Sequence, residues 1–272
     1  MQSIAIGLIR DYSDKLGQVI QMKIAVSGKG GVGKTTISGN LAKLFAREGY
    51  HVYAVDADPD SSLGLSLGIE EEELGRIKPI IEMQEMIGDL AGDGAFYELN
   101  PLVNDIADQF SVNINGIKFL RMGGIKQGGS ACYCRENNFL RAVVNSLLLD
   151  TKDVVILDMG AGIEHLTRGT AQGVDRMLIV TEPGRSSVQT ARIVEKLARE
   201  VSVKAVQFIA NKIRNEKEED FIRNNFSGQE LLGMIHFDDG IAEKSMGAGS
   251  ANSSLLIDNN EIEAILRKII HD

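Results

Sequence analysis

The stretch SGKGGVGKTT at residues 27–36 has the residue types and the spacing to bind a chain of phosphate groups. It follows an apolar run and opens a helical pattern, TTISGNLAKLFAREG, which is the context that a GxxxxGK[ST] phosphate-binding loop requires. Its glycines let the backbone wrap a phosphate with its N–H groups pointing inward. We expect the nucleotide contacts to come from Gly28, Gly30, Gly31, Val32, Gly33, Lys34, Thr35 and Thr36.

Two side chains of this loop and one later carboxylate have a defined chemistry. Lys34 is expected to contact the β- and γ-phosphates of ATP, and the Thr35 hydroxyl to ligate Mg²⁺. The run VVILDMGAG at 154–162 consists of β-branched and aliphatic residues up to Asp158. This is the pattern of a Walker B strand, whose carboxylate holds the magnesium ion through water.

The only two cysteines of the 272-residue chain, Cys132 and Cys134, are separated by one tyrosine. Two residues at this spacing cannot form an unstrained disulfide with each other. They are either buried thiols that act as small hydrophobic side chains, or half of a metal site, because thiolates select Zn²⁺, Ni²⁺ or iron–sulfur clusters. One Cys-x-Cys supplies two ligands, which is incomplete for a tetrahedral or square-planar site.

Short apolar runs must position these residues, and they alternate with longer segments of helical period. The runs are KIAVSG, HVYAVDAD, IKFLRMG, DVVILDMG, RMLIVTEP, AVQFIANK and ELLGMIHF. The alternation predicts an α/β protein: a single-domain P-loop fold, with a mostly parallel central sheet and helices on both faces. Functional loops are then expected at the carboxyl ends of the strands.

Two further segments carry expectations of their own. The acidic, irregular segment from Gly68 to Asn115 looks like an insertion that leads to an edge hairpin. Near the end, EIEAILRKII places Ile262, Ile265, Leu266, Ile269 and Ile270 on one helical face. A membrane-surface helix would show lysine or arginine flanking that face, whereas Arg267 and Lys268 are offset by acidic residues. Packing against the core is therefore favoured.

Composition narrows the classes of function. A formal net charge of −9 argues against a surface that neutralises the phosphates of nucleic acid or anionic lipid. No run of eighteen apolar residues is present, and no disulfide is expected within the chain, so we expect a cytoplasmic protein. Residues 1–21 are a poor signal peptide. We expect them to be an N-terminal extension or a start codon assigned too early, and residues 22–272 to form the ATPase domain.

Lys29 directly follows the first glycine of the loop and gives it the form KGGxGK[ST]. The loop thereby resembles the "deviant" Walker A signature of the MinD, ParA and nitrogenase iron protein superfamily. The resemblance implies that Lys29 crosses a dimer interface to the partner's phosphates, so that ATP joins two subunits into a homodimer. It also implies that Asp58 orients the attacking water, that Asp56 supports the magnesium shell, and that Asn211 hydrogen-bonds the adenine edge. A turn residue is the alternative interpretation of Asn211.

A narrower resemblance involves the cysteines. ACYCRENNFLRAVV, DMGAGIEHLTRGT, DADPDSSLG and VTEP together look like the CooC-type maturation ATPases, which serve nickel insertion into carbon monoxide dehydrogenase, including relatives acting on acetyl-CoA synthase. The likeness runs from about Lys23 to the C-terminus. It implies a homodimer that binds one Ni²⁺, or Zn²⁺ in its place, through Cys132 and Cys134 of both subunits. One departure is His236 in GMIHFDD, where relatives tend to have proline.

Two other functions stay open at this stage. An iron–sulfur carrier or reductase of the same superfamily would bridge a cluster between subunits. Its relatives use two well-separated cysteines or a Cys-x-x-Cys, and this sequence has neither. A partitioning or positioning ATPase would act on DNA or membrane, with incidental cysteines. The acidic net charge and the lack of a basic amphipathic tail argue against that function.

Overall fold

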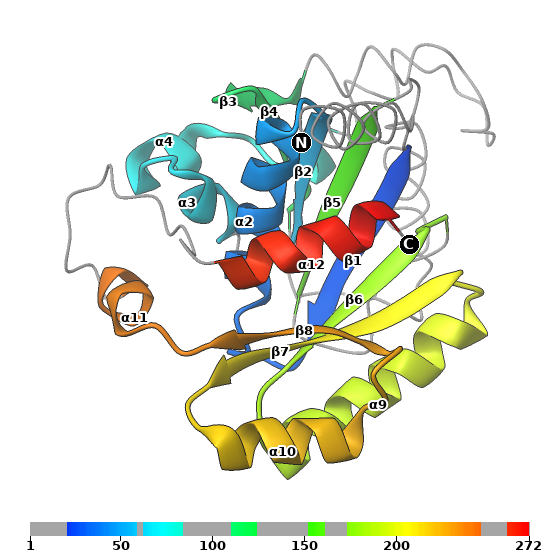
Figure 1. The fold of residues 1–272 in the computed structure, drawn as a ribbon. Coiled ribbons are helices and arrows are strands. Elements are labelled where there is room, and N and C mark those ends of the chain that lie inside the picture. The colour runs from blue at the N-terminus through cyan, green and yellow to red at the C-terminus, as the bar shows by residue number, and fades with distance from the viewer. Residues whose placement is uncertain are drawn as a thin grey trace, which may run out of the picture.

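The described strands form one eight-stranded sheet in the order β3-β4-β2-β5-β1-β6-β7-β8 (Figure 1). This computed structural model describes residues 21–58, 62–83, 110–123, 152–160, 173–245 and 260–271. All neighbouring pairs are parallel except β3 with β4. The strands are β1 (Met22–Gly28), β2 (His51–Ala57), β3 (Val112–Ile114), β4 (Ile117–Arg121), β5 (Asp153–Met159), β6 (Arg176–Thr181), β7 (Ala205–Ile213) and β8 (Leu231–His236).

Each of the seven apolar runs in the sequence forms a strand of this sheet, because strands covered on both faces need apolar side chains at every position. In β5 all seven residues are buried. Val154 and Ile156 pack into the core on one face, and Val155 and Leu157 into the core on the other. Burying a side chain of this kind contributes about 1.5–3 kcal/mol relative to leaving it exposed. The predicted α/β class and the mostly parallel sheet are confirmed.

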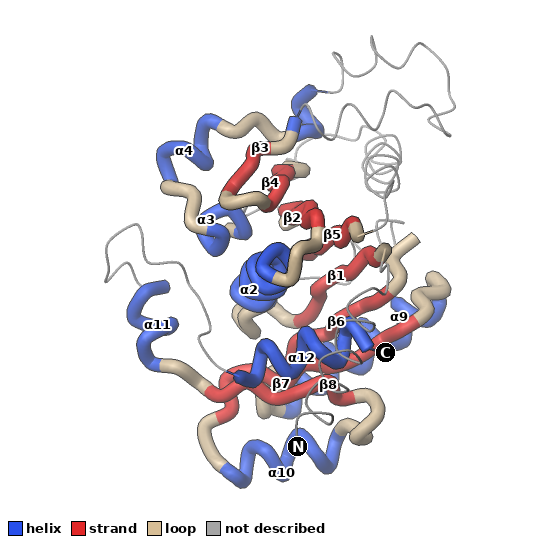
Figure 2. Tube along the Cα trace, turned by 45° about the horizontal axis from the view of Figure 1, so that its top comes forward, coloured by secondary structure: helices blue, strands red, loops and turns tan. Residues whose placement is uncertain are grey.

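Helices cover both faces of the sheet, as Figures 1 and 2 show. One core contains residues of α2 (Lys34–Arg47), α3 (Leu63–Leu67), α4 (Glu71–Arg76) and α12 (Asn260–His271). The other contains residues of α9 (Arg185–Glu200) and α10 (Glu216–Asn225), and Ile80 of the 3₁₀ helix η1 (Ile80–Met83). The short helix α11 (Asp239–Ser245) follows β8. None of the helices described is long and apolar enough to cross a bilayer.

The predicted edge hairpin is present and consists of β3 and β4. Ile114 pairs with Ile117, so the turn contains only Asn115 and Gly116. Both have positive φ, 50° and 87°, as a two-residue turn of this kind requires. The hairpin follows residues 84–109, which lie outside the described ranges, so the expected insertion there stays a prediction.

Helix α12 packs on the core, as its periodicity predicts. Ile262, Ile265, Leu266 and Ile269 are buried. A Cβ added at Gly233 of β8 would lie 2.6 Å from Ile265 Cγ1, so the glycine lets the helix approach closely. At the end of β8, the His236 ring bridges Glu261 (2.6 Å) and Glu219 (3.2 Å). Hydrogen bonding to Glu261 is the main cause that raises the pKa of His236.

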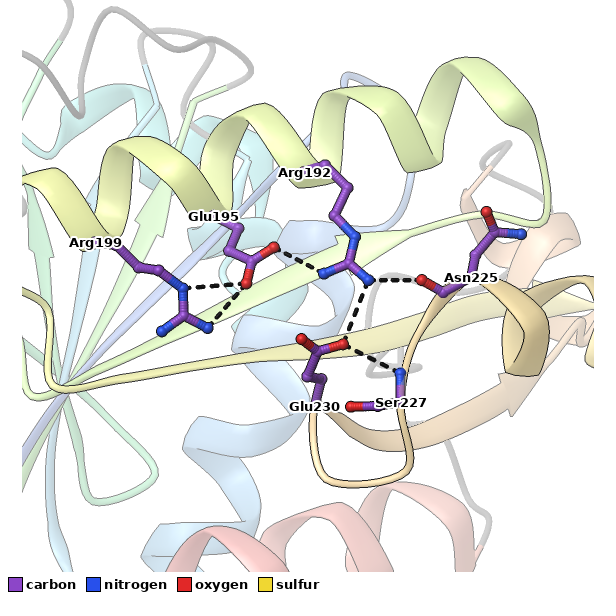
Figure 3. A network of polar contacts seen from close by, with 6 residues as sticks. All are labelled: Arg192, Glu195, Arg199, Asn225, Ser227 and Glu230. Carbon is purple, nitrogen blue, oxygen red and sulfur yellow. Dashed lines mark hydrogen bonds and ion pairs between the residues drawn. The ribbon is translucent and has the colours of Figure 1, made fainter.

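A polar network ties α9 to the segment between α10 and β8 (Figure 3). The Arg192 guanidinium donates to Glu195 (2.8 Å), to the Asn225 carbonyl (2.6 Å) and to Glu230 (3.3 Å). It also lies 5.0 Å and 4.7 Å from the ring centres of Phe208 and Phe226. Arg192 thus links a helix, a strand and a loop that are distant in sequence.

Candidate nucleotide-binding site

The predicted nucleotide residues that the structure describes gather at the carboxyl ends of the central strands. Gly28 ends β1, Asp56 and Asp158 lie near the ends of β2 and β5, and Asn211 lies near the end of β7. Asp56 and Asp158 are direct neighbours in the β2–β5 register, which brings two residues 102 positions apart to one place. Parallel pairing alone places these side chains at one edge of the sheet.

The loop between β1 and α2 has the backbone of a phosphate-binding turn. Gly28, Gly31 and Gly33 have φ of 148°, 81° and 96°, a region that disfavours residues with a Cβ. A Cβ at Gly28 would lie 2.3 Å from the Val180 carbonyl oxygen. Helix α2 begins at Lys34, and no described side chain caps its amino end. The first N–H groups of the helix are thus available to an anion.

The two lysines of the loop differ in their surroundings. Lys34 is buried, and its ammonium group donates to the Lys29 carbonyl at 3.3 Å. Desolvation lowers the pKa of Lys34, although the carboxylates of Asp158 and Asp58 act in the opposite direction. Lys29 is exposed, and its ammonium group donates to Ser186 Oγ at 3.1 Å. Lys34 is thus buried, whereas Lys29 lies at the surface of the described structure.

Asp158 is fully buried at the end of β5. Ser38 Oγ donates to its Oδ1 at 2.9 Å, whereas Oδ2 has no hydrogen-bond partner among the described residues. Burial raises the pKa of Asp158 to about 6, against the hydrogen bonds of Thr35 and Ser38. A buried carboxylate oxygen of this kind fits a site for a hydrated cation, since leaving it unpaired is costly.

Asp56 is also fully buried, but its oxygens already hold backbone N–H groups. Oδ1 accepts from the Asp58 amide at 3.2 Å and Oδ2 from the Leu63 amide at 3.1 Å. Burial and, second, the charge of Asp158 raise the pKa of Asp56 to about 7. Asp56 therefore contacts the backbone of both Asp58 and Leu63. Its expected role in the magnesium shell stays a prediction.

Thr35 lies beside Asp158. Its hydroxyl accepts from Ser62 Oγ at 3.2 Å and favours the ionised form of Asp158. Thr35 and Asp158 together therefore fit a magnesium site, on the chemistry of their oxygens. Ser38 and Ser62 were not predicted from the sequence. Ser38 lies one helical turn after Lys34, a position from which a polar side chain can return to the loop.

Asn211 lies against the loop, with its Nδ2 donating to the Val32 carbonyl at 2.8 Å. A Cβ at Gly33 would lie 2.3 Å from the same nitrogen, so only glycine fits there. Its expected contact with adenine stays a prediction. Thr36 follows Thr35 in the first turn of α2.

Cys132 and Cys134 lie outside the described residues, as do residues 1–20 of the expected extension. Among the residues that are described, no group of three or more His, Cys, Asp or Glu side chains could hold a metal ion. The expectation of a nickel or zinc site at Cys132 and Cys134 therefore rests on the sequence.

Comparison with known proteins identifies the family to which the chain belongs. Residues 23–248 match the model of the CobQ/CobB/MinD/ParA nucleotide binding domain. The carbon monoxide dehydrogenase accessory protein CooC of Rhodospirillum rubrum is 44% identical over 224 residues, which cover 81% of this chain and 85% of that protein. An uncharacterised ATP-binding protein of Methanocaldococcus jannaschii is 42% identical over 226 residues, 80% of this chain and 86% of that protein.

Solved structures show the same fold. MinD of Aquifex aeolicus, in its complex with MinC, matches with a TM-score of 0.65 and 21% identity, over 92% of this chain and 96% of that chain. A ParA family ATPase from Chlorobium tepidum matches with a TM-score of 0.66 and 19% identity, over 93% and 99%. At these identities the likeness concerns the fold alone.

Proposed function

Because the chain belongs to the CobQ/CobB/MinD/ParA family of nucleotide-binding domains and is an ATPase, we propose that it matures a nickel enzyme, carbon monoxide dehydrogenase or acetyl-CoA synthase. The observation that carries the proposal is the 44% identity to CooC over 81% of the chain. The resemblance to CooC-type ATPases that the motifs indicate is confirmed by this identity. The client, the metal and the dimer belong to the proposal.

The nucleotide half of the proposal assigns one task to each residue at the edge of the sheet. Lys34 and the amides of the loop hold the phosphates of ATP. Thr35 and Asp158 would hold Mg²⁺, which supplies charge neutralisation at the phosphates. Asp58 orients the attacking water. Asp56 supports the magnesium shell, and it also accepts hydrogen bonds from the backbone N–H groups of Asp58 and Leu63.

The metal half depends on two subunits. Lys29 is an exposed residue of the phosphate loop, and it would contact the nucleotide of a second copy. Two copies related by a two-fold axis would bring Cys132 and Cys134 of each chain together, giving four sulfur ligands. Such a site exists only while the subunits are closed. Hydrolysis of ATP then opens the dimer and releases the ion, which is the cargo of the reaction.

Replacement of the cysteines tests the metal half of the proposal separately from the nucleotide half. We expect Cys132→Ala and Cys134→Ala to abolish tight Ni²⁺ binding and to leave ATP binding intact, because the cysteines belong to the metal half alone. Equilibrium dialysis measures the binding of Ni²⁺, and titration with ATP measures the binding of the nucleotide. Full nickel stoichiometry in the double variant would refute the metal assignment.

The same preparation distinguishes the iron–sulfur alternative. An ultraviolet–visible spectrum after anaerobic purification shows a broad charge-transfer band if a cluster is bound. We expect no such band, and we expect the colourless protein to take up Ni²⁺. A band that disappears in the cysteine variants would instead support a cluster carrier.

A further inference from the structure

We propose that Lys212, with Glu182 as its anchor, is a positioning residue that holds the phosphate loop in its binding shape from outside. Lys212 Nζ donates to the Gly31 carbonyl at 2.5 Å and pairs with Glu182 Oε1 at 2.8 Å. Its neighbour Asn211 donates to the next carbonyl of the loop, that of Val32. Two consecutive residues of β7 thus hold two consecutive carbonyls. The inference concerns ATP binding and does not depend on the metal half of the proposed function.

Because peptide bonds are planar, holding these two carbonyls also sets the direction of the N–H groups of Val32 and Gly33. In a trans peptide the C=O of one residue and the N–H of the next point in opposite directions. No cis peptide bond occurs among the described residues. Because the carbonyls of Gly31 and Val32 face the side chains of Lys212 and Asn211, the N–H groups of Val32 and Gly33 point away from these side chains. In the proposal, this direction is the inside of the loop. These N–H groups are the donors that a phosphate-binding loop presents to its anion.

Lys212 reaches the loop from a strained backbone position. Its φ is 62°, in the left-handed region, which is unfavourable for a residue with a Cβ. The strain coincides with an irregular register between Ala210 and Ile213 in the pairing of β7 with β8. Glycine would adopt this conformation more easily, but it would lack the ammonium group that reaches Gly31.

Glu182 is itself fixed by the turn between β6 and α9. Its backbone N–H donates to Ser187 Oγ at 3.0 Å, and that hydroxyl also bonds Thr181 Oγ1 at 3.0 Å. The side-chain oxygen that meets Lys212 therefore belongs to an ordered turn. The ion pair between Glu182 and Lys212 therefore connects the phosphate loop to a turn that directly follows a strand of the sheet.

Replacement of Lys212 by glycine tests the proposal without adding backbone strain. We expect Lys212→Gly to keep or raise the unfolding temperature, and to lower the affinity for ATP about tenfold, which corresponds to about 1.4 kcal/mol. Because the loop amides contact phosphate and not the base, tripolyphosphate should lose affinity by the same factor. Both affinities are measured by competition against a fluorescent ATP analogue.

Three further variants sharpen the result. Lys212→Asn also tolerates the left-handed conformation and should behave as Lys212→Gly. Lys212→Arg keeps a cation within reach of both partners and should restore most of the affinity. Glu182→Gln keeps the size of the side chain but removes its charge, and we expect it to lower both affinities about threefold.

A matched control lies in the turn between α9 and β7. Ser202 also has a positive φ, 65°, and is exposed. Ser202→Gly should relieve strain in the same way and leave both affinities at the wild-type value. The proposal is overturned if Lys212→Gly binds ATP and tripolyphosphate within twofold of wild type. It is also overturned if only the affinity for ATP falls, because Lys212 would then act on the nucleoside.

Discussion

At the scale of single residues, the site depends on two buried carboxyl groups that lie side by side. Asp56 and Asp158 are neighbours in the sheet, both fully buried, with pKa values of about 7 and about 6. Both values lie above the ordinary pKa of 3.8. The folded protein thus holds protons between pH 4 and pH 7 that the unfolded chain has lost.

This uptake of protons gives stability a definite dependence on pH. Because the folded state binds more protons in this window, the contribution of these groups to the free energy of unfolding falls as the pH rises. We therefore compare the free energy of unfolding of Asp158→Asn with that of wild type. From pH 5 to pH 8 we expect this difference to shift in favour of the variant, by an amount on the order of 2 kcal/mol. Urea unfolding without nucleotide and with a chelator measures it. A difference between the two proteins that does not change with pH would contradict this account.

Residue types and spacing predicted part of the site but not all of it. The phosphate loop has a sequence pattern of its own, and its glycines are where the backbone requires positive φ. Lys212 has no such pattern. Its contact with Gly31 joins residues 181 positions apart and depends on a local irregularity of β7, which only the folded chain creates.

At the scale of elements, the contacts of Arg192 hold helix α9 against its neighbours in the fold. The guanidinium reaches the Asn225 carbonyl and Glu230 while packing against two phenylalanine rings. We expect Arg192→Met to lower the free energy of unfolding by about 1–2 kcal/mol, because the stem remains and the polar and cation–π contacts are lost. Chemical denaturation measures the change.

Lys196 of the same helix provides a control for this prediction. It is exposed, and its ion pair with Glu200 is long, at 4.0 Å. We expect Lys196→Met to change the free energy of unfolding by less than about 0.5 kcal/mol. Equal effects of the two substitutions would show that the network contributes no more than a surface ion pair.

The elements themselves were largely predictable. Buried parallel strands read as continuous apolar runs, and α12 shows its buried face by its period of apolar residues. The short helices α3, α4 and η1 were not predicted. They contain five, six and four residues, too few for a periodic pattern to stand out. Helices α3 and α4 approach each other closely, since a Cβ added at Gly64 would lie 2.5 Å from Leu74 Cδ1.

At the scale of the whole molecule, the proposed function requires a second copy of the chain. Lys29 is exposed, and among the described residues its ammonium group donates to Ser186 Oγ, so loss of this side chain should disturb the fold little. We expect Lys29→Ala to bind ATP and stay monomeric, because the contact with the partner's phosphates is missing. Light scattering after size exclusion, with ATP present, measures the mass. An ATP-bound dimer of this variant would show that Lys29 does not cross the interface.

The central claim is that ATP-dependent pairing creates the nickel site. The most direct measurement is the Ni²⁺ bound per chain in the presence of a non-hydrolysable ATP analogue and in the presence of ADP, with the molecular mass determined on the same samples. The account predicts one tightly bound ion per two chains in the ATP-state dimer and none on the ADP-state monomer. Equal nickel binding by both states, or a dimer that binds no nickel, would contradict it.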